Sequence, residues 1–216
     1  MVNIGVLVSG SGTNLQSIID AIEAGRCDAS IKIVVSNKAD AFALERAKKH
    51  GIATAVIRVK DFPEREAFDA EVLRILREHG VELVVLAGFM RIISKVLLDG
   101  YHMKIMNIHP SLLPSFPGLE VQKAALDYGV KFSGCTVHFV DNGLDSGPII
   151  IQAVVPVKDE DTAESLSRRI LIEEHRIYPQ AIQLFSEGRI EIRGRRVFIR
   201  NSQPPASSLT NPLITI

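Results

Sequence analysis

The fold of this chain follows from its first stretch, Val2-Asn3-Ile4-Gly5-Val6-Leu7-Val8-Ser9-Gly10-Ser11-Gly12-Thr13-Asn14-Leu15. The first seven of these residues form a short apolar run with β-branched side chains, and the turn-forming residues 9–12 end it. Apolar residues then recur at helical spacing at Leu15, Ile18, Ile19 and Ile22. This order predicts a strand, a glycine-rich loop and a helix.

The same alternation of strand and helix continues to about residue 87. Residues 31–35, 52–59 and 83–87 are predicted strands, and residues 41–50 and 64–79 are predicted helices that each end before a glycine. Residues 83–87 are nearly all apolar, as expected of a strand buried on both faces of a parallel sheet. We therefore expect an α/β fold with a doubly wound, mostly parallel but mixed sheet and a Rossmann-like N-terminal half.

The pattern is less regular beyond Gly88. Pro110 ends a strand expected at 104–109, and the proline-rich residues 110–118 must form a shaped loop. The remaining expected elements are a short helix at 94–98, strands at 131–140 and 149–157, a long helix at 162–185, and a hairpin of residues 190–192 and 196–199. We expect one domain over residues 1–200 and a weakly ordered, uncharged tail at 201–216.

Composition and charge exclude several classes of protein. Lys plus Arg and Asp plus Glu both number 25, so the net charge is zero and no broad basic surface is expected to hold nucleic acid or acidic lipid. Cys27 and Cys135 form no CxxC pair and the histidines lack metal-ligand spacing, so we expect a reducing, cytoplasmic setting and no metal. Glycines interrupt the uncharged residues 1–19, which argues against a signal peptide or membrane anchor.

The glycine loop at residues 10–14 is a candidate phosphate site. Backbone N–H groups and the positive end of a helix dipole meet at such a loop and bind anions. Leu15 replaces the third glycine of a dinucleotide fingerprint, and the second strand ends in Ser36-Asn37-Lys38 without the acid that would hold a ribose. The loop therefore favours a monophosphate over a dinucleotide, and a tight turn that merely needs glycine is the alternative.

Asn107 and His109 are the strongest candidates for chemistry. They alternate along one strand and so point to the same face, at the carboxyl end of the strand, where ligands bind in open α/β sheets. A buried histidine satisfied by a neighbouring carbonyl is the alternative. Asp145, in a glycine-rich turn, is a candidate to orient His109 and favour its charged form. The other histidines are expected to be structural: His50, His79, His102, His138 and His175.

Five blocks of sequence, in order between residues 2 and 190, carry a family resemblance. They are Ser9-Gly10-Ser11-Gly12-Thr13-Asn14-Leu15-Gln16, Ser36-Asn37-Lys38-Ala39-Asp40-Ala41, Leu86-Ala87-Gly88-Phe89-Met90-Arg91-Ile92, Asn107-Ile108-His109-Pro110-Ser111-Leu112-Leu113-Pro114, and His138-Phe139-Val140 through Asp145-Ser146-Gly147-Pro148. Together they resemble the glycinamide ribonucleotide transformylases, a family of folate-dependent formyltransferases. The resemblance implies the formyltransferase fold, with a phosphate-binding half at about residues 1–100 and a folate and catalytic half at about 101–200.

The resemblance also implies a reaction and its site residues. The co-substrate 10-formyltetrahydrofolate would give its formyl group to the amine of 5-phosphoribosylglycinamide in purine biosynthesis. The partners would be small molecules, with a homodimer as one option. Gly12, Thr13 and Asn14 would hold the substrate phosphate, Glu174 would contact the glycinamide, and Asn107, His109 and Asp145 would be catalytic. The folate would lie against Arg65, Met90, Arg91, Ile92, Ile93, Asn107, Asp141, Asn142, Gly143, Leu144 and Asp145.

The chemistry of formyl transfer fits these residues. The substrate amine is itself the nucleophile, so the reaction needs no activated serine or cysteine, and the sequence offers none. The barrier lies in a tetrahedral oxyanion and in protonation of the leaving amine. We expect Asn107 and His109 to donate hydrogen bonds to the oxyanion, with Asp145 tuning His109.

Two departures from the family and three alternative functions remain. Glu120 stands where the family usually has histidine, and Leu171 where a glutamine is familiar, while the resemblance implies a cis Leu113–Pro114 bond. A formyltetrahydrofolate deformylase would use the same catalytic residues with water, but it carries an added domain, as does a methionyl-tRNA formyltransferase. The length of 216 residues is therefore expected to favour the small-substrate transferase. A non-catalytic nucleotide-binding module would leave Asn107 and His109 unexplained.

Overall fold

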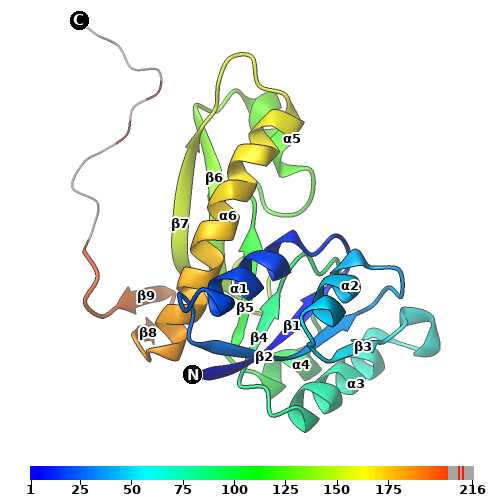
Figure 1. Cartoon of the computed structure of the whole chain (residues 1–216). Helices are drawn as coiled ribbons and strands as arrows, with labels where there is room; N and C mark the ends of the chain where they lie inside the picture. The colour runs from blue at the N-terminus through cyan, green and yellow to red at the C-terminus, as the bar shows by residue number, and fades with distance from the viewer. Residues whose placement is uncertain (204–208, 210, 212–216) are drawn as a thin grey trace, which may run out of the picture.

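The computed structural model describes residues 1–203, 209 and 211, which are built around one mixed β-sheet (Figure 1). Its nine described strands pair in the order β3-β2-β1-β4-β5-β6-β7-β9-β8. The first five are parallel to one another, and the direction changes between β5 and β6. The strands are β1 (Val2–Val8), β2 (Ala29–Ser36), β3 (Thr54–Val56), β4 (Leu83–Leu86), β5 (Ile105–His109), β6 (Phe132–Phe139), β7 (Ile149–Pro156), β8 (Ile190–Arg193) and β9 (Arg196–Ile199).

Helices cover both faces of this sheet. The helices α1 and α6 lie side by side on one face (Figure 1) and share a hydrophobic core with α2 and the sheet, whereas α3 and α4 pack in a second core on the other face. This is the expected doubly wound arrangement. In the described part of the chain, no helix is both long and apolar enough to cross a membrane. The helices are α1 (Thr13–Glu23), α2 (Phe42–Lys49), α3 (Arg65–Glu78), α4 (Lys95–Gly100), α5 (Val121–Tyr128) and α6 (Ala163–Ser186), with a 3₁₀ turn at Val59–Asp61.

The first strand is apolar apart from Asn3, because both of its faces are buried. Val6 and Val8 belong to the core under α1 and α6, and Leu7 between them belongs to the core under α3. Gly5 lies where α3 approaches the strand, since an added Cβ would sit only 2.4 Å from Leu76 Cδ2. The glycine in this strand therefore allows α3 to pack closely against the sheet.

The structure differs from the expected elements in two places. The strand expected at 52–59 is reduced to β3 (Thr54–Val56), because Val56 already pairs with Ser36, the last residue of β2. The helix α5 was not expected. Its N-cap Glu120 has a left-handed backbone (φ 53°) and makes no side-chain capping bond, so the usual sequence signature of a helix start is missing there. Most of the tail expected at 201–216 lies outside the described residues.

The carboxyl ends of the central strands are tied together around Ser9, which follows β1. The Ser9 N–H donates to Gly88 O (3.0 Å) after β4. The Ser9 hydroxyl donates to Asn37 Oδ1 (2.7 Å) after β2 and accepts from Met90 N (2.9 Å). Three loops that follow parallel strands therefore meet at one edge of the sheet, where ligands bind in this class of fold.

Candidate active site

The glycine loop precedes α1 and takes a conformation that only glycine fits. Gly12 is the N-cap of α1 with φ 72°, and a Cβ on it would lie 2.6 Å from Ala43 Cβ in α2. Within the described residues no side chain caps this helix. The first N–H groups of α1, at Thr13 and Asn14, therefore remain available at the positive end of the helix dipole, as an anion site requires.

Asn14 and Glu174 connect the glycine loop to α6. Asn14 Nδ2 donates to Glu174 Oε2 (2.7 Å) in a buried contact, and Asn14 Oδ1 is buried without a partner among the described residues. Burial raises the pKa of Glu174, while the hydrogen bond from Asn14 and the nearby His109 act in the opposite direction. Glu174 therefore lies between the glycine loop and the neighbourhood of His109. Leu171, one of the two departures from the family pattern, lies one helical turn before Glu174 in α6.

Arg46 is a further residue at the glycine loop that the sequence did not reveal. It comes from α2, where its guanidinium stacks on the Phe42 ring at 4.9 Å. Its Nε donates to Ser11 O (2.9 Å) and its Nη1 to Gln16 Oε1 (3.2 Å). The side chain thus braces the backbone of the loop and places a positive charge beside it. No sequence spacing marks this contact, which depends on α2 folding against the loop.

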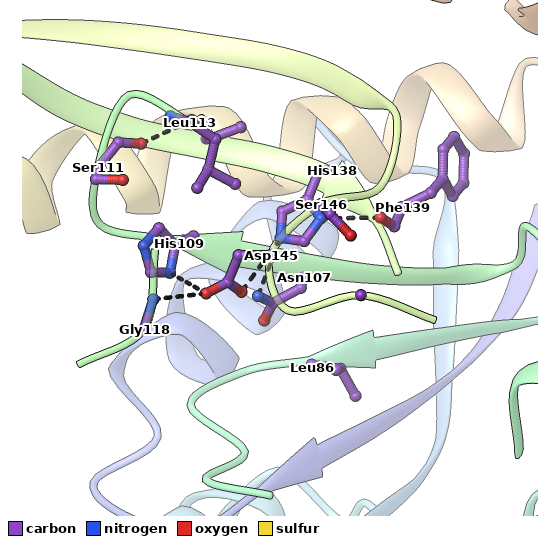
Figure 2. A network of polar contacts seen from close by, with 12 residues as sticks. Leu86, Asn107, His109, Ser111, Leu113, Gly118, His138, Phe139, Asp145 and Ser146 are labelled. Carbon is purple, nitrogen blue, oxygen red and sulfur yellow. Dashed lines mark hydrogen bonds and ion pairs between the residues drawn. The ribbon is translucent and has the colours of Figure 1, made fainter. Parts of the chain in front are cut away.

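The catalytic candidates come together at the carboxyl end of β5 (Figure 2). His109 Nδ1 lies 3.4 Å from Asp145 Oδ2, and the same oxygen accepts from Gly118 N (2.9 Å). Asp145 holds a left-handed backbone (φ 48°) in the loop between β6 and β7. His109 Nε2 donates to Phe116 O (2.9 Å), so both ring nitrogens face protein acceptors. Leu113–Pro114, in the loop that supplies Phe116, is cis as the resemblance implied.

His138 joins this cluster, although its place in the sequence predicts only a structural role. It stands directly opposite Asn107 in the antiparallel pairing of β5 with β6. Its ring is 2% exposed, with Nε2 3.2 Å from Asn107 Nδ2 and 3.9 Å from Asp145 Oδ1. Burial lowers the pKa of His138 and outweighs the opposing effects of the Phe139 carbonyl and Asp145. The missed signal was the strand pairing, which places residues of adjacent strands face to face.

Most of the residues implied for folate lie in two loops, one after β4 and one after β6. Met90 and Ile92, between β4 and α4, are 67% and 65% exposed, whereas Ile93 is buried. Arg91 stacks its guanidinium on the Phe68 ring of α3 at 4.4 Å, and Arg65 stands one turn earlier on the same helix. Residues 141–145 form the second loop, in which Ser146 Oγ donates to Asp141 Oδ1 (2.6 Å).

A cavity of about 310 Å³ opens beside Asp145. Its walls are mostly apolar, and Arg195 from the turn between β8 and β9 reaches them, where its Nη2 donates to Ser146 O (2.6 Å). Within the described residues, no cluster of three or more His, Cys, Asp or Glu side chains is arranged to hold a metal ion. The cavity is lined by Leu113, Pro114, Pro117, Leu144, Asp145, Ser146, Gly147, Ile149 and Arg195.

The fold and this arrangement of polar residues are those of a group-transfer enzyme, and comparison with known proteins gives its family. Residues 2–182 match the model of the formyl transferase family, to which the chain belongs. Among solved structures it is similar to glycinamide ribonucleotide transformylase 1 from Symbiobacterium toebii, with 55% identity, a TM-score of 0.91, and coverage of 92% of this chain and 94% of that one.

Two curated relatives differ in how much of their length this chain spans. Phosphoribosylglycinamide formyltransferase from Escherichia coli (strain K12) is 43% identical over 94% of this chain and 96% of the relative. The trifunctional purine biosynthetic protein adenosine-3 from Drosophila pseudoobscura pseudoobscura is 51% identical over 86% of this chain, but the match spans only 14% of that protein. The chain thus corresponds to one part of the trifunctional relative and to nearly all of the bacterial one.

Proposed function

We propose that this chain transfers the formyl group of 10-formyltetrahydrofolate to the amine of 5-phosphoribosylglycinamide, giving formylglycinamide ribonucleotide and tetrahydrofolate in purine biosynthesis. The observation that carries the proposal is the Asn14–Glu174 hydrogen bond of 2.7 Å, which joins the glycine loop to a carboxyl group influenced by His109. This bond would link the proposed phosphate site to the proposed catalytic cluster at one edge of the sheet. The names of the nearly full-length relatives support transfer of a formyl group to this ribonucleotide.

The ribonucleotide would bind at the loop before α1. Gly12, Thr13 and Asn14 would hold its phosphate through backbone N–H groups, because these lie at the uncapped N-terminus of the helix. Glu174 would accept a hydrogen bond from the substrate amine, which suits a buried carboxyl with one oxygen already bonded to Asn14. Arg46 would add positive charge and hold the Ser11 backbone in place.

The folate would bind across the two loops on the other side of the cluster. The exposed side chains of Met90 and Ile92 offer apolar contact, and the loop of Asp141, Asn142, Gly143, Leu144 and Asp145 would cover the pterin. Arg65, at the start of α3, and Arg91, stacked on Phe68 of that helix, would meet the anionic part of the folate. Ile93 is buried and would support the loop from below. These assignments need no metal and no covalent intermediate.

The transfer would proceed by direct attack of the unprotonated substrate amine on the formyl carbon. A carbon–nitrogen bond to the substrate forms and the carbonyl becomes an oxyanion. The attacking nitrogen then gives up one proton, which passes through His109 or water to N10 of the folate as the bond from N10 to the formyl carbon breaks and the oxyanion returns to a carbonyl. Asn107 would donate to the oxyanion. His109 would also donate to the oxyanion through its Nε2–H. That group donates to the Phe116 carbonyl at 2.9 Å in this structure, so it would have to leave this partner for the substrate oxygen. Asp145 would orient the ring through Nδ1.

The proposed reaction is tested by mixing the protein with 10-formyltetrahydrofolate, with and without 5-phosphoribosylglycinamide, and following the formation of tetrahydrofolate. We expect product only when the ribonucleotide is present, together with its formylated form. Equal release without the ribonucleotide would instead identify a hydrolytic deformylase that uses the same residues with water. No release under either condition would leave a nucleotide-binding module.

A further inference from the structure

The orientation of the Asn107 amide is set by hydrogen bonds that begin outside the site. His138 Nδ1 lies 2.8 Å from Phe139 O (Figure 2). A carbonyl oxygen only accepts, so Nδ1 must carry the proton of this bond. The ring is 2% exposed, and burial disfavours its doubly protonated, charged form. His138 is therefore a neutral ring protonated on Nδ1, and its Nε2 presents a lone pair.

That lone pair decides which way the Asn107 amide turns. The amide lies 3.2 Å from His138 Nε2, and only its NH₂ group can donate to an unprotonated ring nitrogen. The amide oxygen in the same place would face the lone pair without a hydrogen bond. The Asn107 amide is therefore held with Nδ2 toward β6, with one N–H used by His138 and the second N–H left for a ligand.

The groups around His138 keep this arrangement in place. From the loop between β6 and β7, Asp145 Oδ1 lies 3.9 Å from Nε2, too far for a direct hydrogen bond, and Asp141 is a more distant acid. From β5, His109 opposes a positive charge on the ring. His109 is thus the ring closer to Asp145, at 3.4 Å, whereas His138 is the ring within hydrogen-bond distance of the Asn107 amide, at 3.2 Å.

We propose that His138 is a positioning residue for formyl transfer, which holds the Asn107 amide so that its second N–H points at the oxygen of the reacting formyl group. The inference rests on the proposed function, because it assumes that Asn107 donates to the oxyanion. His138 itself touches no reacting atom. Its contribution to turnover passes through Asn107 and disappears when Asn107 is removed.

A double-mutant cycle tests this dependence. His138→Phe keeps an aromatic ring but removes the lone pair. We expect it to lower kcat about tenfold, which is the effect of losing one coupled hydrogen bond, with little change in either KM. In an Asn107→Ala background the same change should lower kcat by less than about twofold, because no amide remains to be oriented. An equal loss in both backgrounds would overturn the proposal.

Tyr101→Phe is the matched control. Like His138→Phe, it removes one buried side-chain donor to a backbone carbonyl. The bond lost here runs from the Tyr101 hydroxyl to Val81 O (3.1 Å) and does not belong to the site. We expect a similar loss of thermal stability for Tyr101→Phe and His138→Phe, with kcat unchanged only in the former. A fall in kcat for Tyr101→Phe of the same size would show that lost stability explains both.

The tautomer of His138 provides a test that needs neither a variant nor activity. In the ¹⁵N NMR spectrum of the intact chain at neutral pH, we expect His138 to be neutral, with its proton on Nδ1 and not on Nε2. A proton on Nε2 would overturn the proposal, since Asn107 would then have to accept rather than donate. Absence of formyl transfer in the wild-type chain would contradict the proposed function and leave this spectroscopic result unaffected.

Discussion

The glycine loop before α1 and the side-chain cluster at β5 lie at the same edge of one sheet but are built in opposite ways. The loop offers backbone N–H groups at an uncapped helix end, and its shape depends on the absence of a side chain at Gly12. The cluster offers titratable rings and a carboxylate, and its shape depends on which atoms carry protons. The first region should respond to added volume, and the second to altered hydrogen-bonding chemistry.

The largest effect is expected from His109→Ala in the cluster. Loss of an oxyanion donor lowers kcat by about 10²–10³-fold, and Asp145 would also lose the partner at 3.4 Å. Folate affinity, measured separately by titration, should stay within about threefold because the folate loops are untouched. His79→Ala, at the exposed end of α3, is the control and should leave kcat unchanged. Full turnover in His109→Ala would remove His109 from the proposed mechanism.

Gly12→Ala should have the next largest effect, on the glycine loop. The new Cβ would collide with Ala43 and would force the loop out of a backbone conformation that disfavours side chains, so the KM for the ribonucleotide should rise about tenfold or more. Gly51→Ala is matched in backbone (φ 67°) but has open space around its Cβ. It should cost about 1–2 kcal/mol of unfolding free energy without changing that KM. Equal KM values for the two variants would contradict a phosphate site at this loop.

Arg46→Ala asks whether the loop also depends on a side chain. Removing the brace to Ser11 O should raise the KM for the ribonucleotide about threefold to tenfold, with kcat and the KM for folate unchanged. Lys48→Ala, which removes an exposed charge two residues away, is the control and should have no effect. A rise in both KM values would mean that Arg46 supports the fold and has no particular role in phosphate binding.

The smallest expected effect is on stability, at the residue between the two regions. Because burial raises the pKa of Glu174, its stabilising contribution is complete below the ordinary value of 4.5 and is lost as the pH rises through the raised value. Glu174→Gln should therefore be more stable than the wild type at neutral pH, and the difference should vanish below pH 4.5. Urea unfolding at both pH values measures this. Glu173→Gln, which loses its ion pair with Arg176, should show no such gain.

The sequence predicts the elements of this fold well where its patterns are local. The glycine loop, the apolar strand β4 and the helix α6 all have periodicity or capping residues that act over a few positions, and the structure confirms them. The helix α5 was missed because its N-cap Glu120 has no capping bond. The strand β3 was overestimated because its end is set by its partner β2 and not by its own composition.

The candidate site shows the same division. Asn107 and His109 are visible in the sequence because they alternate on one strand before a proline, and the structure brings both to Asp145 and its surroundings. His138 and Arg46 act through contacts between segments far apart in the chain, at separations of 31 and 35 residues. No spacing rule within a single segment covers such pairs. They become predictable only once the strand order and the placement of α2 are known.

The change of strand direction between β5 and β6 has a consequence for how this site tolerates insertions and deletions. The pairing of Asn107 with His138 is fixed by the backbone ladder, so the length of the loop between β6 and β7 does not enter it. Asp145 belongs to that loop and depends on its shape, as its left-handed backbone shows. Lengthening the loop would displace the carboxylate while the amide kept its direction, so the two halves of the candidate catalytic cluster can be altered separately.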